Sequence, residues 1–166
     1  MRALRIVIAL WLAIVLQSVL APAIAIAGAR PDFPLIVVIV VALREGSAGG
    51  ALAGFVSGLF VDLNSAHALG ATSLANGLFG FGVGSLGGRL VRDSGLARSV
   101  VALLATTFRD FALGLFMGVG GFGGGVRHFF LSALPDGIYT ALLAAPIMMA
   151  TERVVGWTRE SGRGVS

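Results

Sequence analysis

An arginine and an aspartate stand side by side inside a long apolar stretch of the sequence. Arg109 and Asp110 lie in TTFRDFALG, about halfway along the apolar run 98–120. At the centre of a membrane helix each charge costs about 2.5–3.5 kcal/mol, and such residues usually face the bundle interior with a partner. Neighbours on a helix point about 100° apart, so these two need not pair. We therefore expect Arg109 to reach Asp62, Asp136 or a polar cavity.

Two interpretations of this charged pair are open. In the functional one, Arg109 and Asp110 belong to a pathway through the membrane or to a docking site for a partner. In the structural one, they belong to an internal ion pair that fixes how the helices pack. We favour the structural interpretation.

The other residues that could carry chemistry form no catalytic or metal-binding pattern. His67 and His128 are predicted in or near outer loops, and the sequence has no cysteine. Ser57 and Ser85 lie in glycine-rich helices without a nearby base and without a G-x-S-x-G elbow. The G-x-G-x-x-G matches, one of which starts at Gly82, lack the strand and helix that a dinucleotide site requires. We therefore predict no catalytic residue, no cofactor, no metal and no enzyme activity.

The composition is that of a membrane protein. Of the 166 residues, 57% are hydrophobic and only 12% are charged, against about 25% charged in soluble domains. All twelve basic residues are arginines, placed singly or in twos at the ends of apolar runs, as membrane topology signals are. No basic patch is interleaved with aromatic residues, so nucleic-acid binding is not expected.

Apolar runs separated by charges predict a compact bundle of six transmembrane helices. The second run is short, because about 13 residues at 1.5 Å per residue reach only about 20 Å of a roughly 30 Å hydrocarbon core. It is expected to be a re-entrant or steeply packed half-helix. The first run is too long for a signal peptide and is expected to be retained. The runs are about 4–29, 31–44, 46–63, 69–90, 98–120 and 131–153, in one domain at 1–156 with a short cytoplasmic tail at 157–166.

The arginines predict the orientation of these segments. With six crossings and a cytoplasmic N-terminus, only Arg30 and Arg127 lie outside and Arg109 lies within a span. This distribution follows the positive-inside rule, and it puts both termini in the cytoplasm. The arginines then expected on the cytoplasmic side are Arg2, Arg5, Arg44, Arg89, Arg92, Arg98, Arg153, Arg159 and Arg163.

Small residues recur every four positions in three of the segments, and each row carries polar residues. Residues four apart share one helix face, and faces of small residues let membrane helices approach closely. We expect these rows to pack helices or to contact a partner, with the third, fourth and fifth segments at the bundle centre. The rows are Gly50, Gly54, Gly58 and Asp62; Asn76, Gly80, Gly84 and Gly88; and Thr106, Asp110, Gly114 and Gly118. The glycine-rich segment 118–125 has no assigned role.

A set of short motifs, in a fixed order, resembles the rod shape-determining MreD family. The resemblance covers nearly the full length, and its diagnostic part is residues 31–88. The motifs are Leu16-Gln17, Pro31-Asp32, Leu43-Arg44-Glu45-Gly46, Gly54-Phe55, Gly58-Leu59, Asp62 and Leu69-Gly70.

This resemblance implies a non-catalytic scaffold of the cell-elongation machinery in the bacterial plasma membrane. Its implied partners are the bitopic protein MreC and, through it, MreB filaments and the RodA glycosyltransferase with its transpeptidase. It also implies a bundle similar to the substrate-binding subunits of energy-coupling-factor transporters.

The alternative is a small-molecule-binding subunit of a vitamin-type transporter. A pocket needs several convergent polar groups. The outer loops supply only Asp62, Asn64, His67, Arg127, His128 and Asp136.

Overall fold

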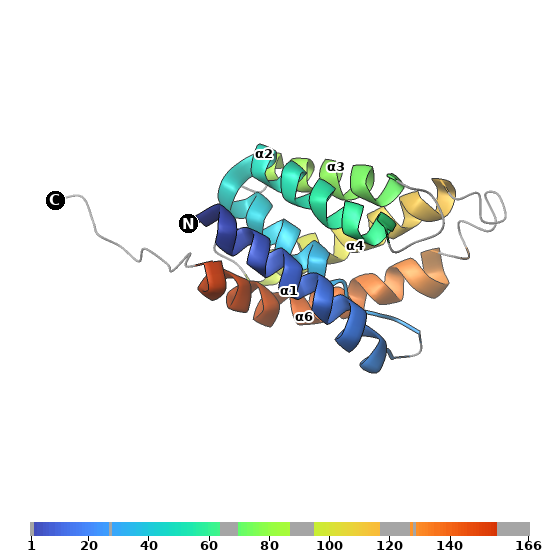
Figure 1. The fold of residues 1–166 in the computed structure, drawn as a ribbon. Helices are drawn as coiled ribbons and strands as arrows, with labels where there is room; N and C mark the ends of the chain where they lie inside the picture. The colour runs from blue at the N-terminus through green and yellow to red at the C-terminus, as the bar shows by residue number, and fades with distance from the viewer. Residues whose placement is uncertain are drawn as a thin grey trace.

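The computed structural model is an all-α bundle (Figure 1). It describes residues 2–26, 28–63, 70–86, 95–116, 127 and 129–155. Within these residues there are five α-helices and one short π-helical segment, rather than the six helices expected from the apolar runs. They are α1 (Arg2–Ala23), α2 (Phe33–Leu63), α3 (Ala71–Leu86), α4 (Gly95–Phe116), η1 (Phe129–Ala133) and α6 (Leu134–Val155).

The second and third expected segments are joined in α2, which is broken at Gly46. Gly46 has φ 82° and ψ −168°, a conformation that glycine adopts readily because it has no Cβ. The chain reverses direction there (Figure 1). We call residues 33–45 the first arm and residues 47–63 the second arm. The break falls where the expected second segment, 31–44, gives way to the third, 46–63.

The first arm is the centre of the bundle. Every residue from Phe33 to Leu43 is buried, as is typical of a helix that is apolar all round. One apolar cluster joins it to α1 through Ala9 and Ala13. A second cluster joins it to α4 and α6 through the small residues Ala102, Ala105 and Ala144.

The expectation that the third, fourth and fifth segments form the centre is therefore wrong. The physical reason lies in side-chain volume. The first arm carries large Val, Ile and Leu side chains on all its faces, and the helices around it supply alanines. Large and small residues then interdigitate at the density of a protein interior.

The outer surface of the bundle is apolar, which identifies an integral membrane protein. Large apolar side chains are exposed on every α-helix, among them Val19, Leu52, Leu78, Leu104 and Leu142. Soluble monomers rarely expose apolar surface so widely. Among the described residues, three helices are long and apolar enough to cross a membrane: Ala3–Ala23, Phe33–Leu63 and Phe130–Val155.

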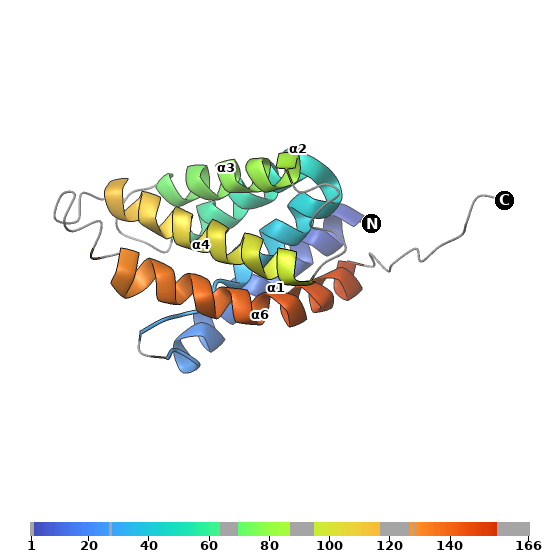
Figure 2. The same ribbon diagram turned by 180° about the vertical axis from the view of Figure 1, so that it is seen from behind.

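The two ends of the bundle differ in composition. One end gathers the start of α1, the Gly46 break, the start of α4 and the end of α6 (Figures 1 and 2). The described arginines at this end are Arg2, Arg5, Arg44, Arg98 and Arg153, and we call it the arginine-rich end. The expected tail 157–166, the glycine-rich segment 118–125, and Asn64, His67, Arg89, Arg92, His128, Arg159 and Arg163 lie outside the described residues.

Candidate functional site: a buried ion network and a glycine-packed helix pair

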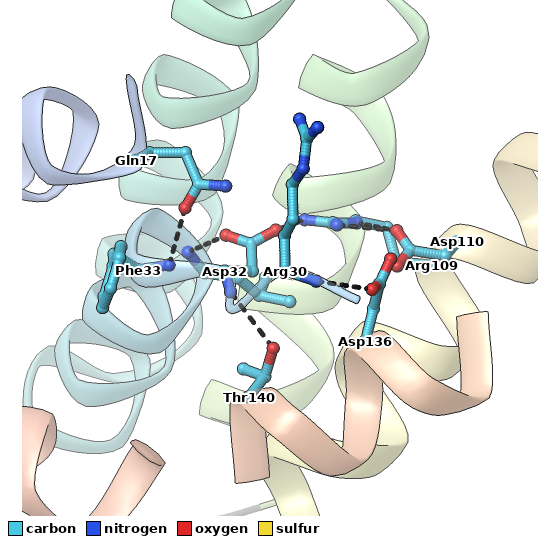
Figure 3. A network of polar contacts seen from close by, with 9 residues as sticks. Gln17, Arg30, Asp32, Phe33, Arg109, Asp110, Asp136 and Thr140 are labelled. Carbon is cyan, nitrogen blue, oxygen red and sulfur yellow. Dashed lines mark hydrogen bonds and ion pairs between the residues drawn. The ribbon is translucent and has the colours of Figure 1, made fainter. Parts of the chain in front are cut away.

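Arg109 lies at the centre of a buried ion network. Its guanidinium forms an ion pair with Asp32, and its Nε and Nη2 donate to Asp110 Oδ1 at 2.9 and 2.6 Å. The three side chains are only 12–15% exposed. A charge buried in this way is tolerated because it is paired and hydrogen-bonded. Figure 3 shows the network between α2, α4 and α6.

The partners of Arg109 differ from those expected. From the sequence we expect Arg109 to pair with Asp62 or Asp136 or to face a polar cavity. We also expect that Asp110 need not pair with Arg109. In the structure the partners are Asp32 and Asp110. The long arginine side chain bends back to the adjacent residue of its own helix, so a 100° offset does not prevent the contact.

Asp32 fixes the start of the central helix. Its Oδ1 accepts the backbone N–H of Leu35 at 2.8 Å, which is how an N-cap residue satisfies a free helix donor. Its own N–H donates to Thr140 Oγ1 of α6 at 3.1 Å. The N–H of Phe33 donates to Gln17 Oε1 of α1 at 3.0 Å. The buried start of α2 is thus held by the helices on either side (Figure 3).

Asp136 and Tyr139 anchor the segment that leads into α2. Asp136 Oδ1 accepts the backbone N–H of Arg30 at 2.8 Å, and the Tyr139 hydroxyl donates to the carbonyl of Ile24 at 2.8 Å. The guanidinium of Arg30 points away from Asp136 in Figure 3. Asp136 therefore holds the backbone of the segment that precedes α2.

The first two glycine rows face each other along the second arm and α3. A Cβ on Gly54 would overlap the backbone of Asn76, and one on Gly50 would overlap the backbone of Gly80. Gly58 meets the backbone of Ser73 in the same way, and Gly84 meets that of Gly46. The two helices thus touch backbone to backbone, and the described parts of both rows are covered within the chain. Gly88 lies outside the described residues.

Asp62 is buried at the end of its row and caps the next helix. The sequence places it at the outer end of a span, where a charge is solvated at little cost. It is instead 2% exposed. It accepts the N–H groups of Gly70, Thr72 and Ser73 at 3.0, 3.2 and 2.9 Å, and the Ser73 hydroxyl at 2.6 Å. These donors satisfy its charge and fix the start of α3.

The third row is only partly described. Thr106 is fully buried, and its Oγ1 has no hydrogen-bond partner among the described residues. Asp110 takes part in the ion network. Gly114 lies in α4, and Gly118 lies outside the described residues. Asn76 of the second row is also buried, and its Oδ1 has no partner in the described part of the chain.

The arginine-rich end holds a second ion cluster, which the sequence does not predict. Glu152 Oε1 pairs with Arg44 Nη2 at 2.8 Å and with Arg98 Nη1 at 3.2 Å, joining the end of the first arm to α4 and α6. From the sequence both arginines are interpreted as topology signals, and no partner is predicted for them. For Asp32 a signal exists, because an aspartate just before an apolar run is a helix-start pattern.

The acidic side chains of the described ion network contact backbone groups and an arginine. Among the described residues, no group of three His, Cys, Asp or Glu side chains is placed to hold a metal ion. The contacts of the network therefore fix helix positions.

Comparison with known proteins identifies the family. The model of the rod shape-determining protein MreD family matches residues 1–153. No curated protein matches the chain, and no solved structure matches it, so similarity to the energy-coupling-factor subunits stays a prediction. Because the family match spans nearly the whole chain, the protein belongs to the MreD family of rod shape-determining membrane proteins.

Proposed function

We propose that the protein is a non-catalytic scaffold of the cell-elongation machinery. In this role it binds partner membrane proteins in the bacterial plasma membrane and helps to organise peptidoglycan synthesis. The observation that carries the proposal is the family match over residues 1–153. The described polar residues support it, because they hold helices together rather than converge on a reacting group.

The proposed direct partner is an MreC-like bitopic membrane protein. Through it the scaffold would reach MreB filaments and the RodA glycosyltransferase with its transpeptidase. The rows that begin at Gly50 and Asn76 are the candidates for the partner interface from the sequence, but their described parts are covered within the chain. We propose instead that the contact lies on an exposed stripe of the second arm, formed by Leu52, Phe55, Leu59 and Leu63. These positions share one helix face.

The proposed topology has six crossings, with the two arms of α2 as separate crossings and both termini in the cytoplasm. The reversal at Gly46 supports two crossings within α2. The arginine-rich end supports a cytoplasmic location for that end, because cytoplasmic loops carry an excess of arginine.

Site-specific photocrosslinking in native membranes tests the scaffold and its contact face. A photoreactive residue is placed at Leu52, Leu59 or Leu63 on the stripe. Controls are Leu142, exposed on α6, and Met148, which is fully buried. We expect the stripe positions to crosslink one bitopic membrane protein, and Met148 to give only intramolecular products. Crosslinking from Leu142 alone would show that the partner binds at α6 and not at the stripe. The absence of crosslinks at all exposed positions would contradict a stable helix partner.

One feature favours the alternative of a transporter subunit that binds a small molecule. Buried and partly buried polar groups of α1, α4 and α6 meet Asp32 just before α2. They are Gln17, Arg109, Asp136 and Thr140 (Figure 3). A pocket requires such convergence, yet each of these groups already has a partner in the chain. Mass spectrometry of the protein purified in native lipid separates the two functions. A stoichiometric vitamin-like ligand would support the transporter and contradict the scaffold.

A further inference from the structure

The second arm and α3 form a tightly joined pair, which we call the hairpin (residues 47–63 and 71–86). Close backbone contacts at Gly50, Gly54 and Gly58 run along its length. At one end Asp62 ties the second arm to the start of α3 through four hydrogen bonds. At the other end Gly84 packs against the backbone of Gly46 and Ser47. Such contacts leave little room for the two helices to move separately.

The remaining elements are joined by a different set of interactions. We call α1, the first arm, α4, η1 and α6 the body. Arg109 and Asp32 tie α4 to the start of the first arm. Glu152 ties the end of the first arm to α4 and α6 through Arg44 and Arg98. Both ends of the first arm are therefore fixed in the body, and the second ion cluster lies immediately before Gly46.

The contacts between the hairpin and the body are fewer than those within each unit. Among the described residues, the hairpin reaches the two apolar clusters through Ala53, Phe79 and Val83. The ring of Phe79 also meets that of Phe108 in α4 edge to face, with centroids 5.5 Å apart. Close to the break, a Cβ on Gly50 would also overlap that of Ala42 in the first arm. The contacts named above lie farther from the break and are apolar and non-directional, whereas ion pairs or backbone contacts fix each unit internally.

Polar groups without a hydrogen-bond partner in the described part of the chain are buried in both the hairpin and the body. Ser57 Oγ and Asn76 Oδ1 belong to the hairpin and Thr106 Oγ1 belongs to α4. Each is at most 1% exposed, and each lacks a hydrogen-bond partner in the described part of the chain. A buried polar atom without a partner raises the free energy of the packed state. An arrangement that lets water or another group reach these atoms removes that cost.

A single backbone position connects the first arm to the hairpin. Gly46 has a positive φ, and a Cβ built there would meet no atom within 4 Å. Glycine is thus used for its backbone freedom and not for close packing. From these observations we propose that the hairpin moves as a rigid unit relative to the body about Gly46. Hinge motion of this kind is concentrated in a few residues at the ends of elements.

Electron paramagnetic resonance distances between spin labels test this motion without reference to any partner. The chain has no cysteine, so each pair of introduced cysteines carries the only labels. Leu59→Cys with Ile138→Cys spans hairpin and body. Leu63→Cys with Phe81→Cys lies within the hairpin, and Leu4→Cys with Ile138→Cys lies within the body. All of these positions are exposed.

We expect a broad or two-peaked distance distribution for the hairpin–body pair, and a single narrow one for each control pair, in the purified protein in lipid. A hairpin–body distribution as narrow as both controls would overturn the proposal. A broad distribution within the hairpin would also overturn it, because the hairpin would then not be rigid.

Thiol reactivity gives a second measurement that does not need paired labels. Ala53→Cys lies at the boundary, and Met148→Cys lies inside the body, and both native side chains are buried. If the hairpin opens, a water-soluble maleimide reacts about tenfold or more faster at position 53 than at position 148, because reaction follows local opening. Equal, slow reaction at both positions would contradict the motion.

Discussion

At the scale of single residues, burial decides what each charged group does. Arg109, Asp32 and Asp110 are neighbours in an apolar environment, where the cost of desolvation is met only by pairing. The sequence shows that Arg109 needs a partner but not which one, because Asp32 is 77 positions away in the chain. Asp62 is similar: its row could be read from the spacing, but its role as a cap depends on where α3 begins.

Removing Arg109 should destabilise the protein strongly. Arg109→Leu leaves Asp32 and Asp110 buried without their cation, and breaking a buried pair in this way costs about 3–5 kcal/mol. Thermal unfolding in detergent should show a lower midpoint, and the amount of protein in the membrane should fall. Arg153→Leu is the matched control, because Arg153 is exposed.

A compensated variant separates the effect of the unpaired charges on stability from the effect of the lost arginine side chain. Arg109→Leu combined with Asp32→Asn and Asp110→Asn removes the unpaired charges, so most of the lost stability should return. If the triple variant is as unstable as Arg109→Leu, the ion network is not the source of the defect. A stable triple variant that fails to support rod shape would favour the functional interpretation of Arg109.

Replacing Asp62 should loosen the start of α3. Asp62→Ala removes the acceptor for the N–H groups of Gly70, Thr72 and Ser73, and the loss of a cap costs about 0.5–2 kcal/mol. Asp62→Asn keeps one acceptor oxygen and should lose less. Hydrogen exchange at the first turn of α3 is the measurement, and equal exchange in the native protein and in Asp62→Ala would contradict the role.

At the scale of elements, the sequence predicts the packing surfaces better than the arrangement of helices. The rows that begin at Gly50 and Asn76 can be predicted from spacing, because period four places residues on one helix face. The charges at Arg44 and Glu45 separate the second and third segments. The buried position of the first arm cannot be predicted from the sequence. A helix that is apolar all round suits either lipid or a protein core, and only the alanines of its neighbours distinguish the two.

Two glycines on the pair of packed helices should respond differently to substitution. Gly54→Ala places a Cβ in the backbone of Asn76, whereas a Cβ at Gly82 meets no atom within 4 Å. Overpacking typically costs about 1–3 kcal/mol, so Gly54→Ala should lower the unfolding midpoint. Gly82→Ala should leave it unchanged or raise it, since alanine is the better helix former. Equal effects at both positions would mean that the two helices do not pack through the glycine rows.

At the scale of the whole molecule, the apolar outer surface indicates a bundle in a membrane. The arginine-rich end supports the proposed orientation, with that end on the cytoplasmic side. We predict that reporters fused after Val155 and within the break at Gly46 are active on the cytoplasmic side. Reporters inserted after Arg30 should be active on the outer side. Alkaline phosphatase and a cytoplasm-active fluorescent protein provide opposite readouts at each site. An outer location for the C-terminal fusion would remove one crossing from the proposed six.

We propose that this MreD-family protein acts as a scaffold through a membrane partner. The most direct measurement is purification of the intact protein from its native membranes in mild detergent, followed by identification and quantification of everything that remains bound. We predict a bitopic protein of the elongation machinery at a fixed ratio to the scaffold. Recovery of the protein without it, together with a bound vitamin or an ATPase module, would contradict the account.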